Sequence, residues 1–404
     1  MEFSRIGFQT MEKYRRDSMM KPLKTAVIGM GTMGSKYAAF LLNGQVPAME
    51  LAAVTRVRPE RLKAMNLTLP DDLPVFPSAD ALFQALDEGR LSLDAVIIVT
   101  PHRLHEEQTL AAMKRGLHVL CDKPAGISSR QARSAEEFCP AELTYAFIFQ
   151  QRTFPVYKKI RELVQSGKYG SLKRVSWTVT DWYRPNLYYQ EVSWRGTWLL
   201  DGGGTLLNQC PHNLDLLQWI CGVPSRVQGF CHNGKYHPIE VEDEVTAYME
   251  WDNGASGVFT ASTGEAPGVN RLEISLDNGL IIYENGELKV CCLDKPELEY
   301  RLHAEDAFVK PKSTWETIPL ETNQQPYLEI LDNFAAAVQE GSPLIAPGEE
   351  GRKSLLLSNA VYLSSWTGKM ISIPKEGSED EKIFEEEFEK EWRKRAGAAE
   401  NPSM

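Results

Sequence analysis

Gly29, Gly31 and Gly34 have the residue type and the spacing of a phosphate-binding turn. They follow a short apolar run, Ala26–Ile28, and precede a stretch that suits a helix, Met33–Leu42. Between a strand and a helix, the first glycine permits a tight turn, the second admits a pyrophosphate, and the third allows close packing. Free N–H groups at a helix N-terminus also favour negative charge. The sequence therefore predicts a dinucleotide site, and the alternative is a glycine-rich turn without a ligand. The residues expected at this site are Gly29, Met30, Gly31, Thr32, Met33 and Gly34.

Arg56 follows the second predicted strand, Glu50–Thr55. At this place a fold that prefers NAD has Asp or Glu, which binds the 2′-hydroxyl of the ribose. An arginine would instead stack on adenine and pair with a 2′-phosphate. We therefore expect NADP as the cofactor. NAD remains the alternative, with Arg56 solvated and the cofactor bound by other groups.

Lys123, Asn208 and His212 are the candidate catalytic residues. Lys123 comes directly after the predicted strand Leu117–Cys121, at the edge where open α/β sheets bind ligands. Asn208 and His212 lie on one face if a helix runs from Gly204 to Ile220. Oxidation of an alcohol needs a hydride acceptor, a base and a donor to the developing alkoxide. A nicotinamide, His212 and Lys123 would fill these roles, because a nearby ammonium keeps imidazole neutral. The alternatives are a surface lysine and a packed histidine.

An aromatic-rich segment, residues 182–198, precedes the glycines at 202–204. Aromatic faces with polar groups suit the C–H face and hydroxyl rim of a sugar. We expect Trp182, Tyr183 and Arg184 to bind a carbohydrate-type substrate, whereas Trp198 is expected in the core. Arg184 and Arg195 could pair with an acidic group of the ligand, or Arg195 with the cofactor. Core packing is the alternative for the whole segment.

Two domains with different kinds of sheet are expected to position these residues. From Lys24 to Phe147, short strands alternate with helices, which predicts a parallel sheet with right-handed crossovers, a Rossmann domain. Beyond Phe149 a helix at Pro155–Ser166 is followed mainly by strands. Asp252-Asn253-Gly254 and Asp277-Asn278-Gly279 are hairpin signals. They indicate an open, largely antiparallel sheet, so the fold class is α/β plus α+β.

We expect an N-terminal extension at 1–21, a dinucleotide-binding domain at 22–148 and a substrate and oligomerisation domain at 149–374. The charged segment 375–404 is expected to be a surface helix or partly disordered. Two late helices, Gln325–Gln339 and Gly348–Thr367, should pack back on the body. The predicted strands are Ala26–Ile28, Glu50–Thr55, Ala95–Thr100, Leu117–Cys121, Leu143–Phe147, Leu172–Thr180, Arg226–Cys231, Glu242–Trp251, Ala255–Ser262, Arg271–Leu276, Gly279–Glu284 and Glu287–Cys292.

Composition narrows the classes of function. The 404 residues carry a formal charge of −11, which argues against nucleic acid or an anionic membrane as the main partner. No apolar run is long enough to cross a bilayer. The chain has seven cysteines without a regular framework. An odd number of cysteines without regular spacing is typical of a protein in a reducing cytoplasm, and it predicts neither a disulfide framework nor a metal site.

Four further motifs, in this order and spacing, resemble the glucose–fructose oxidoreductase / inositol dehydrogenase (Gfo/Idh/MocA) family. They are Thr100-Pro101-His102-Arg103-Leu104-His105, Asp122-Lys123-Pro124, Phe149-Gln150-Gln151-Arg152 and Gly202-Gly203-Gly204 through His212 to Asp215. The resemblance covers roughly Lys24 to Pro374. It implies a cofactor along the first domain, a substrate between the domains, and a homodimer or homotetramer paired through the open sheet.

The resemblance also assigns roles to single residues. Asp122-Lys123-Pro124 looks like the family's Glu-Lys-Pro, whose lysine reaches the reacting centre, and His212 matches its acid/base. Many members have a carboxylate where this chain has Asn208, which puts a proton-transfer role of that position in doubt. The cofactor contacts implied are Thr100, Pro101, His102, His105, Asp122, Lys123, Gln151, Trp194 and Arg195. The substrate contacts expected are Lys123, Arg152, Trp182, Tyr183, Arg184, Asn208 and His212.

The expected function is that of an NAD(P)-dependent oxidoreductase acting on a secondary hydroxyl or ketone of a sugar, sugar derivative or cyclitol. Two alternatives remain open. One is a glycosidase that uses tightly bound NAD for transient oxidation. The other is a non-catalytic cofactor-binding regulator.

Overall fold

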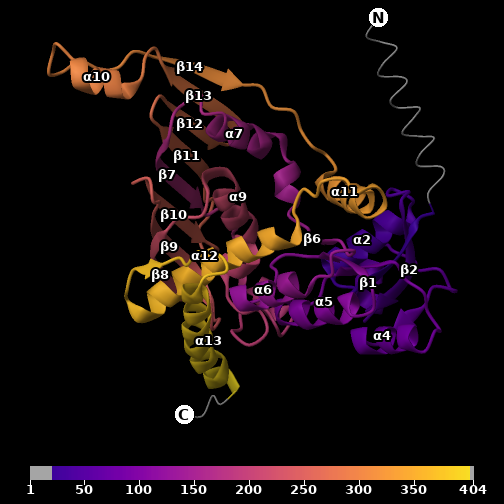
Figure 1. The fold of residues 1–404 in the computed structure, drawn as a ribbon. Helices are drawn as coiled ribbons and strands as arrows, with labels where there is room; N and C mark the ends of the chain where they lie inside the picture. Colours follow the sequence, from indigo (N-terminus) through magenta and orange to yellow (C-terminus); the bar gives the residue numbers. More distant parts are fainter. Residues whose placement is uncertain (1–20, 401–404) are drawn as a thin grey trace, which may run out of the picture.

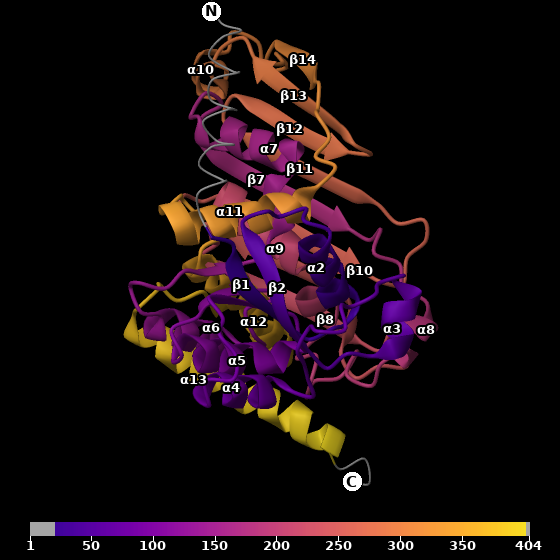
Figure 2. The ribbon, with the colours of Figure 1, turned by 90° about the vertical axis from the view of Figure 1, so that its right-hand side faces the viewer.

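The computed structural model describes residues 21–400, so the predicted N-terminal extension lies almost wholly outside the described residues. Figures 1 and 2 show two sheets with helices between and around them. The first sheet lies in the N-terminal part, and the second forms one side of the molecule. Helix α12 lies between the two sheets, and α13 extends downward from it on the side of the second sheet.

The first sheet has six parallel strands in the order β3-β2-β1-β4-β5-β6, the order of a classic dinucleotide-binding domain. It confirms the predicted Rossmann domain. Its strands are β1 (Leu23–Ile28), β2 (Met49–Thr55), β3 (Val75–Phe76), β4 (Ala95–Ile98), β5 (His118–Cys121) and β6 (Tyr145–Phe147). Its helices are α2 (Thr32–Leu42), α3 (Pro59–Ala64), α4 (Ala79–Asp87), α5 (His105–Met113) and α6 (Ser129–Phe138).

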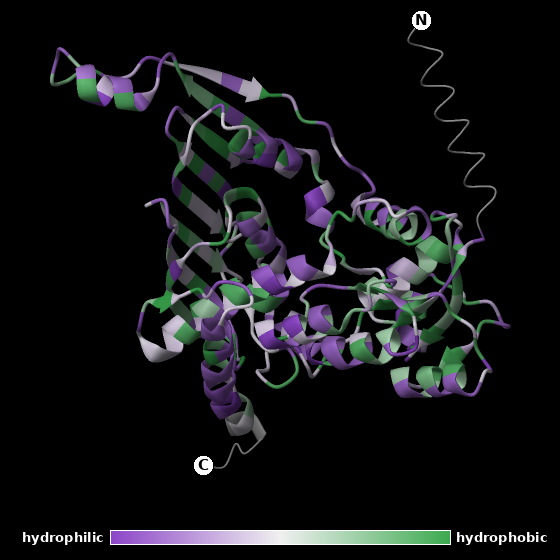
Figure 3. Ribbon diagram, in the orientation of Figure 1, coloured by the Kyte–Doolittle hydropathy of each residue, from purple (hydrophilic) through white to green (hydrophobic). Residues whose placement is uncertain are grey.

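The second sheet has nine strands in the order β14-β13-β12-β11-β7-β10-β9-β8-β15. Only β7 and β10 pair in parallel, so the sheet is largely antiparallel as predicted. Figure 3 shows hydrophobic and hydrophilic residues alternating along its strands, because one face covers the core. The strands are β7 (Leu172–Val179), β8 (Arg226–Asn233), β9 (Glu242–Glu250), β10 (Ser256–Ser262), β11 (Asn270–Leu276), β12 (Gly279–Glu284), β13 (Glu287–Leu293), β14 (Ser313–Ile318) and β15 (Ile371–Ser372).

The remaining helices join the two sheets into one body. Helix α12 packs against α6 of the first domain and against β8 and α9 of the second. Helix α11 buries Leu328, Leu331 and Phe334 in a cluster with Val27, from the first sheet. These helices are α7 (Pro155–Gln165), α8 (Asn186–Gln190), α9 (Pro211–Cys221), α10 (Glu297–His303), α11 (Pro326–Glu340), α12 (Gly348–Thr367) and α13 (Glu379–Glu400).

The predicted helix from Gly204 to Ile220 is wrong in one respect. The structure has a wide π-type turn at Thr205–Gln209, and α9 begins only at Pro211. Proline has no N–H to donate to the preceding turn but suits the first helical position, so it divides the segment. Asn208 and His212 therefore lie on two elements rather than on one helix face.

The charged C-terminal segment forms α13, the helical alternative of the prediction. It is not a loose surface helix, because Phe384 and Phe388 are buried and Phe388 stacks on Trp366. Arg133 pairs with Glu385 at 2.6 Å, and Arg130 pairs with Glu389. The segment is thus attached to the α6 and α12 side of the molecule.

Candidate active site

The glycine turn has the geometry of a dinucleotide cradle. Gly29 has a φ of +103°, and a Cβ there would lie 2.6 Å from the carbonyl oxygen of Val99. A Cβ on Gly34 would lie 1.9 Å from the Gly29 oxygen. A Cβ on Gly31, by contrast, would meet nothing within 4 Å. Protein packing therefore explains the first and third glycines, whereas a ligand approaching the backbone explains the second. No side chain caps α2, which leaves its N-terminal turn, from Thr32 and Met33, free to bind phosphate.

Arg56 lies just past the end of β2 in the left-handed region, with a φ of 55°. Its backbone N–H donates to Phe76 across the neighbouring strand, and its side chain is exposed. Within the described part of the chain, the guanidinium makes no ion pair, so it is available to a ligand on this edge of the sheet.

Lys123 reaches from the end of β5 to the second domain. Its ammonium donates to the backbone oxygen of Asn208 at 2.9 Å, and its backbone N–H donates to the Asp122 carboxylate at 2.9 Å. Burial lowers the pKa of Lys123, whereas the nearby Asp122 and Asp201 carboxylates oppose this shift. Burial raises the pKa of Asp122 to about 6. One of the three ammonium donors is used, so two remain for a ligand.

His212 lies near the start of α9 and is buried. Its Nε2 is 3.1 Å from the Nε2 of Gln150, which also contacts the Tyr327 hydroxyl at 3.1 Å. The Nδ1 of His212 is buried without a hydrogen-bond partner among the described residues. Burial, with a further contribution from the Lys123 charge, lowers the pKa of His212 well below its usual value. The ring is therefore neutral near pH 7, with one nitrogen held by protein and the other open.

Asn208 is held by a carboxylate that the sequence reasoning missed. Its Nδ2 lies 3.1 Å from both carboxylate oxygens of Asp201, and its Oδ1 accepts from the Tyr188 hydroxyl at 3.2 Å. Asp201 is buried, and burial raises its pKa to about 7. The only sequence signal for Asp201 is its place directly before the three glycines.

A second buried carboxylate, Glu242 of β9, fixes the backbone after those glycines. It accepts from the N–H groups of Gly204 and Leu206 at 2.9 and 2.8 Å and from the Tyr362 hydroxyl at 2.7 Å. Burial raises the pKa of Glu242 to about 7. These bonds set the path of the turn that carries Asn208.

The segment after β4 tethers the Lys123 loop. His105 has Nδ1 2.7 Å from the Pro124 oxygen and Nε2 2.7 Å from the Thr100 oxygen. Since both ring nitrogens are engaged, the predicted cofactor contact through the His105 ring is corrected to a positioning role. The Nδ1 of His102 is 2.9 Å from the Asp201 backbone oxygen. The Thr100 hydroxyl donates to Gln108, and Pro101 lies between β4 and the 3₁₀ turn that starts at His102.

The aromatic segment places Tyr188 between two guanidinium groups. The Arg184 Cζ is 4.9 Å and the Arg195 Cζ 4.0 Å from the centre of its ring. Arg195 also donates to the Tyr188 backbone oxygen at 2.8 Å, and the Trp194 ring lies 5.7 Å from that of His102.

Three further members of this segment separate into different environments. Trp182 is partly buried with an unpartnered indole N–H, whereas Tyr183 is 51% exposed. Trp198 is buried, as predicted, and packs on Tyr362 and Trp366.

Gln151, predicted near the cofactor, has a buried amide oxygen without a partner in the described chain.

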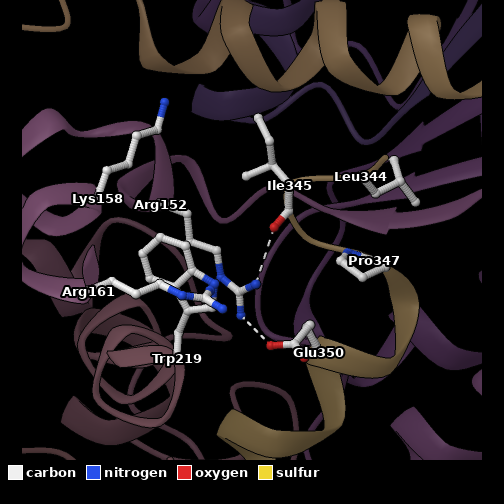
Figure 4. Close-up of a pocket in the computed structure, with 8 residues that line it drawn as sticks. All are labelled: Arg152, Lys158, Arg161, Trp219, Leu344, Ile345, Pro347 and Glu350. Atoms are coloured by element: carbon white, nitrogen blue, oxygen red, sulfur yellow. Dashed lines mark hydrogen bonds and ion pairs between the residues drawn. The ribbon is translucent and has the colours of Figure 1, made fainter. Parts of the chain in front are cut away.

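Arg152 is the predicted substrate contact that the structure contradicts. Its Nε and Nη2 donate to Asp215, Nη2 also pairs with Glu350 at 2.7 Å, and Nη1 donates to the Ile345 oxygen. Figure 4 shows the contacts of Arg152 with Ile345 and Glu350 beside Trp219. These residues line a separate pocket of about 380 Å³. With its guanidinium saturated by protein groups, Arg152 joins the 3₁₀ turn after β6 to α9 and α12.

Among residues 21–400, no helix is both long and apolar enough to span a membrane. The same part of the chain contains no cluster of His, Cys, Asp and Glu that could hold a metal ion.

Two family models match the chain. An oxidoreductase family with an NAD-binding Rossmann fold covers residues 23–142, and a GFO/IDH/MocA C-terminal domain covers residues 157–282. Myo-inositol 2-dehydrogenase of Thermotoga maritima is 26% identical over 353 residues, which are 85% of this chain and 96% of the relative. D-glucoside 3-dehydrogenase of Escherichia coli is 26% identical over 379 residues, which are 87% of this chain and 98% of the relative.

Among solved structures, the WlbA dehydrogenase of Bordetella pertussis in complex with NADH and UDP-GlcNAcA has a TM-score of 0.71 and 21% identity. The match covers 88% of this chain and 100% of that one. Because the two family models together span more than half of the chain, the protein belongs to the GFO/IDH/MocA family of NAD-binding oxidoreductases.

Proposed function

We propose that the protein oxidises or reduces a secondary hydroxyl or ketone of a sugar, sugar derivative or cyclitol, with His212 as acid/base and Lys123 as alkoxide stabiliser. Two observations support it: the buried His212 Nδ1 has no partner among the described residues, and the Lys123 ammonium is held by the Asn208 backbone oxygen of the second domain. Inositol and glucoside dehydrogenases among the relatives support this substrate class.

Gln150 sets which His212 nitrogen carries the proton. With the amide oxygen of Gln150 on Nε2–H, the Nδ1 lone pair accepts the hydroxyl proton during oxidation. With the amide nitrogen toward Nε2, Nδ1 carries the proton and donates it during reduction. The Tyr327 hydroxyl suits both orientations, because it donates to an amide oxygen or accepts from an amide nitrogen.

Lys123 stabilises the oxygen that develops negative charge. Its ammonium is oriented by the Asn208 carbonyl, and its side chain is partly buried between the two domains. Such a preorganised donor acts more strongly in a low dielectric than in water. NAD(P), bound by the glycine turn and the N-terminus of α2, supplies the hydride acceptor or donor.

The exposed Arg56 supports NADP over NAD in this proposal, since a guanidinium pairs well with a 2′-phosphate.

The seven unpaired cysteines support a location in a reducing cytoplasm. The exposed side chains of Phe230, Tyr248 and Val258, on β8, β9 and β10, support pairing of subunits through the second sheet. Light scattering should give a dimer or tetramer.

The deciding experiment mixes the purified protein with NADP or NAD and panels of free sugars, cyclitols and glycosides. Net appearance of the reduced nicotinamide absorbance supports the proposal. Cleavage of a glycoside without net cofactor turnover would instead identify the NAD-using glycosidase. Cofactor binding without either reaction would identify a regulator, although such a protein has no need of the Lys123 and His212 pair.

A further inference from the structure

Arg184 is a cation without an acidic partner at the edge of the candidate active site. One of its amino groups donates to the Tyr183 backbone oxygen at 3.0 Å. Its Nε is buried and has no hydrogen-bond partner in the described chain. Among residues 21–400, no carboxylate forms an ion pair with it. The side chain as a whole is partly exposed, but a buried N–H donor without a partner is costly unless a ligand completes it.

The guanidinium is held by two aromatic rings rather than by anions. Its Cζ lies 5.2 Å from the Trp182 ring and 4.9 Å from the Tyr188 ring. Contacts with aromatic faces restrain the group while its N–H donors stay available in the guanidinium plane. The indole N–H of Trp182 is a second buried donor without a partner among the described residues. Both groups can only donate, so a fitting ligand must present acceptor oxygens.

These donors are connected to the reacting groups by a short path. The Tyr188 hydroxyl donates to the Asn208 side chain at 3.2 Å, and the Asn208 backbone oxygen accepts from Lys123 at 2.9 Å. The positive charge of Arg184 contributes to the lowered pKa of Lys123, which places the two cations within electrostatic reach. A neutral sugar would leave this charge unbalanced, whereas an anionic substituent would neutralise it.

We propose that the substrate carries a carboxylate, as a uronic or aldonic acid does, and that Arg184 and Trp182 bind this group. The planar fork of arginine matches the two oxygens of a carboxylate. The inference rests on the proposed oxidoreductase function and narrows its substrate class to acidic sugars. The donors lie on the segment 182–188 that follows β7 of the second sheet, whereas the cofactor phosphates are expected at the glycine turn and α2 of the first domain.

The test compares matched pairs of methyl glycosides and methyl glycosiduronates from the gluco, galacto and manno series, which differ only at C6. The corresponding hexose 6-phosphates form a third arm. For the preferred series, kcat/KM for the uronate should exceed that for the neutral glycoside about tenfold or more, as expected for a charge-assisted bond. Arg184→Gln should remove the preference, so that within this variant kcat/KM for the uronate falls to that for the neutral glycoside, whereas the Kd for NAD(P) stays unchanged. Arg184→Lys should keep part of the preference. Arg174→Gln, an exposed arginine of β7, is the matched control.

Binding is measured separately from turnover, by thermal stabilisation of the cofactor complex with each uronate. Stabilisation of the wild type that is absent in Arg184→Gln supports the inference. Turnover of neutral glycosides without a preference for any uronate would overturn it and leave the proposed function intact. A preference for the 6-phosphates would also overturn it. A uronate that binds through Arg184 without any nicotinamide reduction would overturn the proposed function but not the carboxylate site.

Discussion

Asp201 faces Asn208, with both carboxylate oxygens 3.1 Å from the amide nitrogen. The carboxyl group that position 208 lacks is therefore present beside it, supplied by a residue earlier in the chain. Asp201 also contributes to the electrostatic environment of Lys123. Its pKa of about 7 means that this carboxyl changes charge near neutral pH.

Asp201 should make stability depend on pH. Its folded pKa of about 7 lies above the usual value of 3.8, so between these pH values the native state holds a proton that the unfolded state releases. The stabilising contribution is complete below pH 3.8 and is lost as pH rises through 7. Asp201→Asn should therefore lose less in Tm than the wild type as pH rises from about 4 to about 7. Asp71→Asn, in an exposed loop, is the control, and parallel curves for all three proteins would contradict the assignment.

His212→Ala and Lys123→Ala should each lower kcat by about 10²–10⁴. The first removes the proposed acid/base, and the second removes the proposed donor to the developing alkoxide. The Kd for NAD(P), measured by fluorescence quenching, should stay close to the wild-type value. His232→Ala provides the control, since this histidine is exposed on β8. Near-normal turnover in either variant would remove that residue from the mechanism.

Gln150→Glu should move the acid limb of the kcat/KM profile to higher pH. In the wild type, burial and Lys123 lower the pKa of His212, so activity should persist below pH 6.5. A carboxylate on Nε2 favours imidazolium and raises that pKa. Gln150→Leu should instead cost about five- to tenfold in kcat, the worth of one hydrogen bond. An unchanged acid limb in Gln150→Glu would show that Gln150 does not control the His212 ring.

Arg56→Asp should weaken NADP binding and favour NAD, because it replaces a phosphate partner by a carboxylate that suits the 2′-hydroxyl. The loss for NADP should be about 1.5–3 kcal/mol, the worth of one charge-assisted bond. Titration calorimetry with both cofactors measures the ratio. Lys114→Asp makes the same charge change at the C-terminal end of α5, away from the cofactor edge, and should leave the ratio unchanged. Tighter NAD binding by the wild type, with no shift in the variant, would reject NADP.

Truncation after residue 374 should destabilise the protein strongly. It removes α13, exposes the surface that buries Phe384 and Phe388, and leaves Arg133 without Glu385. Loss of large buried aromatic side chains costs about 3–5 kcal/mol each, so a Tm fall of many degrees or aggregation is expected. Truncation after residue 400 is the control. An unchanged Tm after the longer truncation would show that α13 is dispensable.

The sequence predicted the elements whose signal is local. The glycine turn, the parallel sheet of the first domain and both Asp-Asn-Gly hairpins follow from short patterns. The catalytic roles of Lys123 and His212 stay predictions. The roles of Asp201 and Gln150 were missed, because they depend on contacts between loops, and no periodic pattern in the sequence predicts such contacts. Arg152 was misassigned for the same reason, since its partner Glu350 lies 198 residues later.

Helix α11 has a consequence for how the chain is made. It covers the first sheet with side chains such as Leu331 and Phe334, although it follows nearly all of the second sheet in sequence. During synthesis, residues 22–148 leave the ribosome before α11 exists, so this apolar face of the first sheet is exposed to solvent. Helix α11 begins about 180 residues later, at residue 326. A nascent chain of that length is therefore a natural client for a chaperone, and the first domain expressed alone should be poorly soluble.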